Sequence, residues 1–196
     1  SVYGANQIMP FNEIQKTETP LSFYAATKKS NELMAHSYSH IFGLPVTMFR
    51  FFTVYGPWGR PDMALFKFID AIENNRPIDV YNYGKMKRDF TYVEDLVTSI
   101  ENLIGCVPPV HSDRSPKHVN EVDSLSPVAP YRVVNIGNSN PTELMDYIAA
   151  LENALGVKAE KNMLPMQSGD VPATWADTEL LKKLTGYIPS TPVEVG

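Results

Sequence analysis

The 196-residue chain is 43% hydrophobic and 20% charged, which is ordinary for a globular protein. Its formal net charge of -5, without a basic run, disfavours nucleic acid as a partner. No apolar run approaches the length of a membrane-spanning helix, so we expect no membrane partner. The single cysteine, Cys106, excludes an internal disulfide bond and fits a reducing cytoplasm.

The opening residues "SVYG" resemble the end of a buried strand and its turn, and no methionine precedes them. We therefore expect the sequence to be part of a longer chain. Residues 6–22 are polar and contain Pro10 and Pro20, which predicts a surface loop. Apolar spacing over 22–42, followed by Gly43 and Pro45, predicts a helix.

The next elements are predicted from short patterns. The stretch "VTMFRFF" (46–52) predicts a buried strand, 64–75 an amphipathic helix, and 78–84 a strand that ends in a turn. A helix is expected over 93–105, with Gly105 as its C-cap.

Residues 107–130 contain five prolines and predict a loop or a disordered insert. A strand over 131–137 follows, then a helix over 141–156 with Asn140 as N-cap, and a short helix over 176–186. Alternation of strands and helices favours an α/β fold with a largely parallel sheet.

Tyr24 and Lys28 lie four residues apart in the first predicted helix. A free tyrosine has a pKa of about 10, and a nearby cation lowers it by favouring the phenolate. One helical turn brings both groups to the same side, where they could move a proton to or from a hydroxyl group. Taken alone, a tyrosine and a lysine four residues apart often arise by chance. Many such tyrosines only pack against neighbouring side chains and have no catalytic role.

A series of motifs surrounds this pair, namely "SVYG", "SFYAATKKSNE", "RFFTVYGPWGRPDMALFKF", "YGKMKRDFTYVEDLV", "NIGN" and "GDVPATWAD". In this order the chain resembles the extended short-chain dehydrogenase/reductase family, and within it the NAD-dependent epimerase/dehydratase enzymes, especially nucleotide-sugar epimerases that act on UDP-glucuronate. The resemblance covers the chain except 107–130.

The resemblance implies the carboxy-terminal part of a Rossmann-type parallel sheet, interleaved with a small α/β substrate-binding lobe. Residues 1–55 would belong to the NAD-binding domain and 56–196 mainly to the substrate-binding lobe. Segments of about 90–105 and 131–155 would return to the Rossmann part.

The resemblance also implies roles at matching positions. Tyr24 would be the catalytic tyrosine, and Lys28 would lower its pKa and bind the nicotinamide ribose of NAD. Phe52 and Pro57 would lie beside the nicotinamide.

At the substrate side, Thr53 would lie beside the sugar, Arg88 would bind the diphosphate and Asp170 would hold the nucleotide end. From the residues alone, Arg88 could instead be a surface arginine paired with Asp89 or Glu94.

Arg60 lies on the turn that follows the strand, where α/β enzymes place ligands. We hypothesise that it binds the glucuronate carboxylate together with Thr53; the alternative is a solvated turn residue. His36, His40, His111 and His118 have no metal-ligand spacing, so we expect no metal site.

Two departures from the family pattern matter. The sequence has no GxxGxxG turn for the dinucleotide phosphates. The family's catalytic serine or threonine falls three residues before the valine of "VYG", which is Val2 here, and so precedes Ser1. We therefore expect the 196-residue chain by itself to be inactive.

For the longer protein, the resemblance implies a cytoplasmic homodimer that interconverts UDP-glucuronate and UDP-galacturonate by oxidation and reduction at C4, with NAD as cofactor. Alternatives are a UDP-glucuronate decarboxylase, a sugar-nucleotide dehydratase, or a non-catalytic nucleotide-sugar-binding or dimerisation module.

Overall fold

The computed structural model describes residues 1–110, 123–167 and 169–196. Residues 111–122 of the predicted insert, with His111 and His118, lie outside the described residues. The elements in chain order are α1 (Phe23–Phe42), β1 (Val46–Phe51), β2 (Thr53–Tyr55), α2 (Ala64–Glu73), β3 (Ile78–Val80), the 3-10 helix η1 (Tyr81–Gly84), β4 (Lys87–Tyr92), α3 (Val93–Ile104), β5 (Tyr131–Ile136), β6 (Pro141–Glu143), α4 (Leu144–Leu155), β7 (Lys161–Met163), β8 (Ala173–Thr174) and α5 (Glu179–Thr185).

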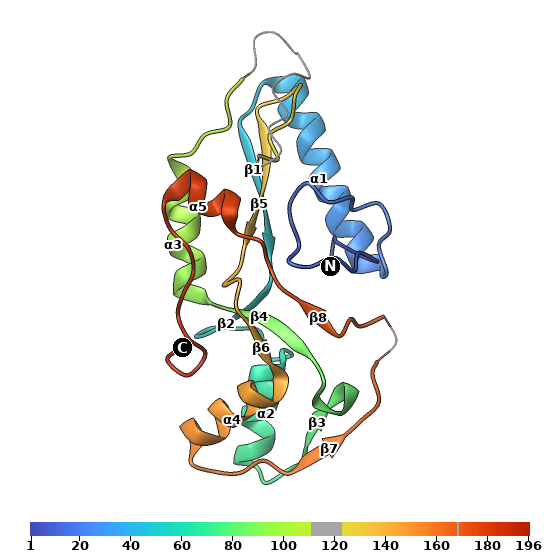
Figure 1. Cartoon of the computed structure of the whole chain (residues 1–196), viewed down its shortest axis with the longest axis vertical. Helices are drawn as coiled ribbons and strands as arrows, with labels where there is room; N and C mark the ends of the chain where they lie inside the picture. Colours follow the sequence, from blue (N-terminus) through green and yellow to red (C-terminus); the bar gives the residue numbers. More distant parts are fainter. Residues whose placement is uncertain (111–122, 168) are drawn as a thin grey trace.

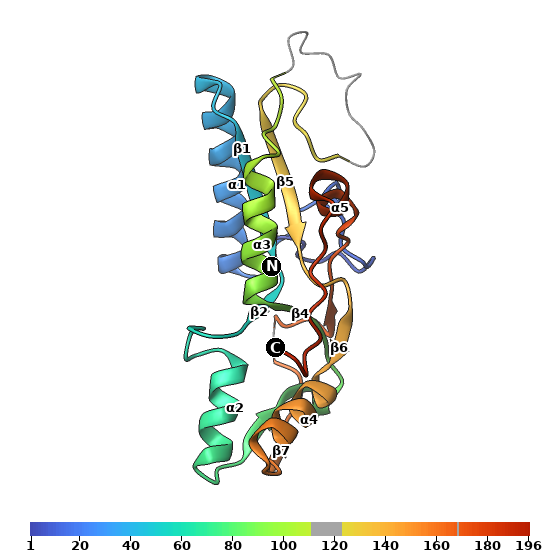
Figure 2. The ribbon, with the colours of Figure 1, turned by 90° about the vertical axis from the view of Figure 1, so that its left-hand side faces the viewer.

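The molecule is elongated, and its elements form three parts along its length (Figures 1 and 2). At one end, α1, α3 and α5 flank the strand pair β1–β5; we call this part the β1–β5 body. At the other end, α2 and α4 lie with the strand pair β3–β7, which we call the β3–β7 body. The β4 sheet, made of β2, β4, β6 and β8, lies between them.

In the β1–β5 body, the two strands pair in parallel over six residues each. Alternate residues of a strand face opposite sides of the sheet. Val133 accordingly packs in a cluster with Ala35 of α1, whereas Val134 and Ile136 pack with leucines of α3 and α5. Helices therefore cover both faces of the pair, and the predicted α/β class is confirmed.

The β4 sheet contains a strand that the sequence did not reveal. β4 pairs in parallel with β2 and β8 and antiparallel with β6. Its residues Asp89, Phe90 and Thr91 are buried. Because "KRDFTY" begins with three charged residues and has no apolar pattern of its own, the burial of β4 depends on these neighbouring strands.

The β3–β7 body has an aliphatic core. Phe68, Ile72, Ile78 and Val80 pack there with Ile148, which is fully buried on α4. Of the segment 131–155, α4 therefore packs on α2 and β3 in this body, whereas β5 pairs with β1 in the other body.

The first predicted helix is confirmed as α1, and its ends have clear causes. The Ser22 hydroxyl accepts a hydrogen bond from the Ala25 N–H at 3.1 Å, which caps the amino terminus. Gly43 ends the helix with a φ of 64°, a left-handed conformation that glycine adopts without strain. The prediction that Gly105 is the C-cap of α3 is also confirmed.

Three predictions of local structure are wrong. β1 is not a buried strand, because only Arg50 is buried in it, and Phe51 is 46% exposed. The strand at 78–84 ends at Val80, and η1 follows. The helix at 141–156 begins at Leu144 with Glu143 rather than Asn140 as N-cap, because residues 141–143 pair with β4 as β6.

Within the described ranges, no helix combines the length and the hydrophobicity that crossing a membrane requires.

Candidate active site

A cavity of about 400 Å³ lies between the amino-terminal residues, α1 and the end of β1. Four of the predicted site residues line it, namely Tyr24, Lys28, Phe52 and Thr53. The structure therefore brings together the predicted catalytic pair, one predicted cofactor residue and one predicted sugar residue.

Tyr24 and Lys28 lie in the first two turns of α1, one turn apart. Both side chains are exposed, and the Lys28 Nζ atom is 5.4 Å from the centroid of the Tyr24 ring. Long side chains on a helix lean towards its amino terminus, which brings Lys28 over Tyr24. Among the described residues, Lys28 makes no ion pair. Tyr24 and Lys28 thus line the cavity together, with the ammonium group over the ring.

Phe52 and Thr53 lie where the chain passes from the β1–β5 body to the β4 sheet. β1 pairs with β5, whereas Thr53 opposite Phe90 begins the pairing of β2 with β4. The Phe52 ring packs against Tyr3 with centroids 6.4 Å apart. The junction between two parts of the fold therefore fixes these residues at the cavity wall.

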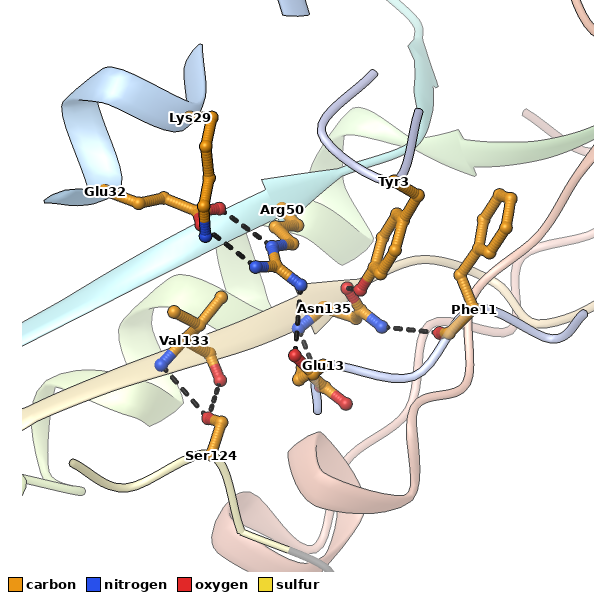
Figure 3. Close-up of polar contacts among 9 residues, drawn as sticks. All are labelled: Tyr3, Phe11, Glu13, Lys29, Glu32, Arg50, Ser124, Val133 and Asn135. Carbon is orange, nitrogen blue, oxygen red and sulfur yellow. Dashed lines mark hydrogen bonds and ion pairs between the residues drawn. The ribbon is translucent and has the colours of Figure 1, made fainter. Parts of the chain in front are cut away.

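A buried ion pair that the sequence analysis missed lies in the same wall. Arg50 of β1 binds Glu32 of α1 through both carboxylate oxygens, at 2.8 and 2.9 Å (Figure 3). Lys29 also pairs with Glu32, at 3.0 Å. Burial would raise the pKa of Glu32, but the hydrogen bonds and charge of Arg50 and Lys29 lower it overall. Glu32 is therefore held as a carboxylate inside the protein.

Further polar contacts connect this pair to the amino-terminal residues (Figure 3). Arg50 donates to the backbone carbonyl of Glu13 at 3.2 Å, and its guanidinium lies 4.8 Å from the centroid of the Tyr3 ring. The Tyr3 hydroxyl donates to Asn135, whose backbone N–H donates to the Glu13 carboxyl group at 2.8 Å. One hydrogen-bond network thus joins the "VYG" segment, the helix α1, and the strands β1 and β5.

Burial shifts the ionisation of two members of this network. It raises the pKa of Glu13 to about 7, despite the hydrogen bond from Asn135. It also raises the pKa of Tyr3 to about 12, so Tyr3 stays a neutral hydrogen-bond donor.

Arg88 and Asp170 form a second polar site, on β4 and on the segment before β8. Arg88 Nη2 lies 2.9 Å from Asp170 Oδ1, so neither Asp89 nor Glu94 is its partner. Arg88 stands opposite Thr174 in the pairing of β4 with β8, and Thr174 lines the 400 Å³ cavity. The Arg88–Asp170 site is therefore next to the 400 Å³ cavity, and Thr174 of β8 lies between them.

The buried carboxylate of Asp89 holds this junction together. It accepts hydrogen bonds from the N–H groups of Asn138, Ser139 and Ala176 at 2.7, 3.1 and 3.0 Å. Burial raises the pKa of Asp89 although these bonds oppose the shift. A Cβ atom at Gly137 would lie 2.6 Å from Asp89 Oδ2, which explains a glycine at that position.

Besides Arg88 and Asp170, the predicted site residues Pro57 and Arg60 also lie outside the cavity wall. Pro57 is exposed and does not line it. Arg60 is 69% exposed in its side chain and pairs with Asp62 at 3.0 Å, so the structure does not bring it to Thr53.

The described histidines have structural partners. His36 Nε2 is 2.8 Å from Ser126 Oγ, and His40 Nδ1 is 2.7 Å from the carbonyl oxygen of Val128. In the part of the chain that the structure describes, no group of three or more His, Cys, Asp and Glu side chains could hold a metal ion.

Comparison with known proteins gives a consistent family. The model of the NAD dependent epimerase/dehydratase family matches residues 1–104. A probable UDP-glucuronate 4-epimerase of Rhizobium meliloti (strain 1021) is 57% identical over 197 residues, which are 100% of this chain and 57% of that protein. UDP-glucuronate 4-epimerase 4 of Arabidopsis thaliana is 44% identical over 200 residues, which cover 100% of this chain and 44% of that protein.

A solved structure is similar to nearly the whole of this chain. The UDP-glucuronic acid 4-epimerase of Bacillus cereus, in complex with UDP-glucuronic acid and NAD, has a TM-score of 0.80 and 30% identity, and the match covers 99% of this chain and 55% of that one. This chain thus spans about half the length of the proteins it matches. Because the family model covers more than half of the chain, the protein belongs to the NAD dependent epimerase/dehydratase family.

Proposed function

We propose that this chain serves an NAD-dependent epimerase that interconverts UDP-glucuronate and UDP-galacturonate at C4. The observation that carries the proposal is the position of Tyr24 and Lys28, one turn apart and facing a cavity that Thr53 also lines. The names of the Rhizobium meliloti and Arabidopsis thaliana relatives support the choice of substrate.

In this proposal Tyr24 moves the proton of the C4 hydroxyl group. The ammonium group of Lys28 lies over the ring and places a positive charge beside Tyr24, which acts as the general base towards the sugar. When bound, NAD supplies the hydride acceptor and donor for C4.

The open cavity beside Lys28 and Phe52 fits the nicotinamide-ribose end of NAD, with Pro57 on the adjoining turn. No GxxGxxG turn for its diphosphate occurs in the 196 residues.

Arg88 and Asp170 are proposed to bind the UDP part. A guanidinium group suits a diphosphate because its planar fork makes two parallel hydrogen bonds. Asp170 accepts a hydrogen bond from one nitrogen of that fork, Nη2, in the described structure. Substrate binding would therefore exchange the carboxylate of Asp170 for the diphosphate, and Asp170 would turn to the nucleotide.

Thr53 and Arg60 are proposed to hold the glucuronate carboxylate. Oxidation at C4 gives a β-keto acid, which loses CO₂ when the breaking bond stands perpendicular to the ketone plane. An epimerase must hold the carboxylate near that plane, whereas a decarboxylase must not. Because Arg60 is exposed and its pair with Asp62 lies at the surface, its side chain can exchange partners at little cost.

The assembly and location are also proposals. We propose a homodimer formed through α1, because Phe23, Met34, Ile41 and Phe42 of that helix are 57–87% exposed. A cytoplasmic location is supported by the free thiol of Cys106. We further propose that the β1–β5 body belongs to the NAD-binding domain, and that the β4 sheet and the β3–β7 body belong to the substrate-binding lobe.

The test uses a chimera in which this chain replaces the matched residues of the Rhizobium meliloti relative. With UDP-glucuronate and NAD, the chimera should form UDP-galacturonate. Tyr24→Phe should lower turnover by about 10²–10⁴-fold, because it removes the proton acceptor. Tyr38→Phe, on the same helix and also exposed, is the matched control and should retain activity.

Mass spectrometry of the products separates the proposed function from its alternatives. A chimera that forms no UDP-galacturonate, or a Tyr24→Phe variant with unchanged turnover, would contradict the proposal. Release of UDP-4-keto-pentose by the unaltered chimera would favour a decarboxylase.

A further inference from the structure

Glu32 follows Lys28 by four residues on α1, one turn further along the helix. Side chains at this spacing are neighbours, and an opposite charge there is an available ion-pair partner. Glu32 lines the same cavity as Lys28 and Tyr24. A free carboxylate at this position would compete with Tyr24 for the ammonium group of Lys28.

Arg50 prevents that competition in the described structure. Its Nε and Nη2 atoms occupy both carboxylate oxygens of Glu32, at 2.8 and 2.9 Å (Figure 3). The side chains of Arg50 and Glu32 are only 6% and 7% exposed. A bidentate pair of this kind fixes the direction of the carboxylate as well as its charge.

The surroundings of Arg50 keep it in place. Its third nitrogen donates to the carbonyl oxygen of Glu13 at 3.2 Å, and its flat face lies 4.8 Å from the Tyr3 ring centroid. Contacts on three sides leave the guanidinium no freedom to release Glu32. Lys28, in contrast, is exposed, and its Nζ atom lies over the Tyr24 ring.

We propose that Arg50 is a positioning residue, which holds the carboxylate of Glu32 away from Lys28 and so leaves Lys28 beside Tyr24. The catalytic meaning of this arrangement rests on the proposed function; the arrangement itself does not. Neither Arg50 nor Glu32 needs to touch substrate or cofactor for this role.

The first experiment measures Lys28 directly, on the 196-residue chain and without any activity. The folded chain is labelled with an amine-reactive N-hydroxysuccinimide ester, and mass spectrometry compares the labelling rate of Lys28 with that of exposed Lys67 on α2. Arg50→Met should slow labelling at Lys28 about twofold, the factor that an ion pair at this spacing produces. Adding Glu32→Gln to Arg50→Met should restore the rate.

Lys29→Met is the matched control, because it removes a cation from Glu32 but leaves Arg50 on both oxygens; its Lys28 should label at the normal rate. Loss of a purely structural contact would leave Lys28 labelling unchanged or faster. An unchanged or faster rate in Arg50→Met therefore overturns the proposal. If that variant does not fold, Arg50→Lys takes its place, since it keeps the charge but frees one carboxylate oxygen.

The second experiment measures turnover in the chimera. Arg50→Met should lower kcat by about twofold, the factor expected in labelling, with little change in KM, because a displaced catalytic group loses rate rather than binding. The double variant with Glu32→Gln should recover most of that loss. A double variant as slow as Arg50→Met overturns the proposal. If the unaltered chimera has no activity, the proposed function fails, and the labelling experiment still decides the role of Arg50.

Discussion

Both ends of the molecule have an apolar core, but they differ in how a buried carboxylate is paired. In the β3–β7 body, the core cluster is aliphatic and aromatic, with Ile78, Val80 and Ile148 almost completely inaccessible. The buried carboxylate of this body, Glu152 of α4, pairs with lysines that solvent reaches, Lys158 and Lys161. In the β1–β5 body, Arg50 and Glu32 are buried between the predicted catalytic helix and the sheet. Apolar burial stabilises without strict direction, whereas a buried ion pair requires one geometry and leaves an uncompensated charge when it is broken. We therefore expect loss of volume to destabilise either end, and loss of charge to matter most in the β1–β5 body, where both partners of the ion pair are buried.

The largest effect on stability is expected in the β3–β7 body. Ile148→Ala should lower the free energy of unfolding by about 2–5 kcal/mol, because it removes buried methyl groups and leaves a cavity. Urea denaturation measures this loss, and Ile104→Ala on α3, where the side chain is 74% exposed, is the control with an effect within about 0.5 kcal/mol. A loss as small as that of the control would contradict an apolar core at this end.

The next effect concerns charge in the β1–β5 body and depends on pH. The pKa of Glu13 is about 7 in the folded protein, because burial raises it from 4.5. The folded state therefore holds a proton that the unfolded state has released, so this stability is complete below about pH 4.5 and is lost as pH rises through about 7. Between pH 5 and 8 the free energy of unfolding should fall by roughly 2–3 kcal/mol.

Glu13→Gln should remove this pH dependence, because the amide oxygen can still accept the hydrogen bond from Asn135 but no longer titrates. Urea denaturation at both pH values measures it, with the exposed Glu18→Gln as the control. If the free energy of unfolding falls equally between the two pH values in Glu13→Gln and in the unaltered chain, another group is responsible for the pH dependence.

The smallest effect is expected at the junction of the two ends. Asp89→Asn replaces one acceptor oxygen by an N–H₂ group that faces backbone donors, which should cost about 1–3 kcal/mol. Hydrogen exchange should become faster at Asn138, Ser139 and Ala176, the three donors to Asp89. Asp79→Asn, on the exposed side of β3, is the control. Unchanged exchange at all three amides would contradict the role of Asp89.

Local signals in the sequence predicted α1 and the proximity of Tyr24 to Lys28. The apolar spacing, the stop at Gly43 and the four-residue separation of Tyr24 and Lys28 are all properties of one segment. Burial of Arg50 could not be predicted in this way, because its partner Glu32 lies 18 residues away and on another element.

The ends of elements were missed for a related reason. Residues 141–143 follow a helical pattern, but pairing with β4 makes them a strand. The Arg88–Asp170 pair joins residues 82 apart, so the sequence offered only nearer acidic residues as partners. Long-range pairing overrode local preference at each of these positions.

The hydrogen bonds to Asp89 also constrain the order in which the chain folds. They connect residues 49, 50 and 87 positions apart along the sequence. The entropy lost in closing such long loops must be offset before these bonds can contribute, so contacts of this kind slow folding. The helices can therefore form early, because their contacts are local, and the junction on which Arg88 lies is expected to be completed later.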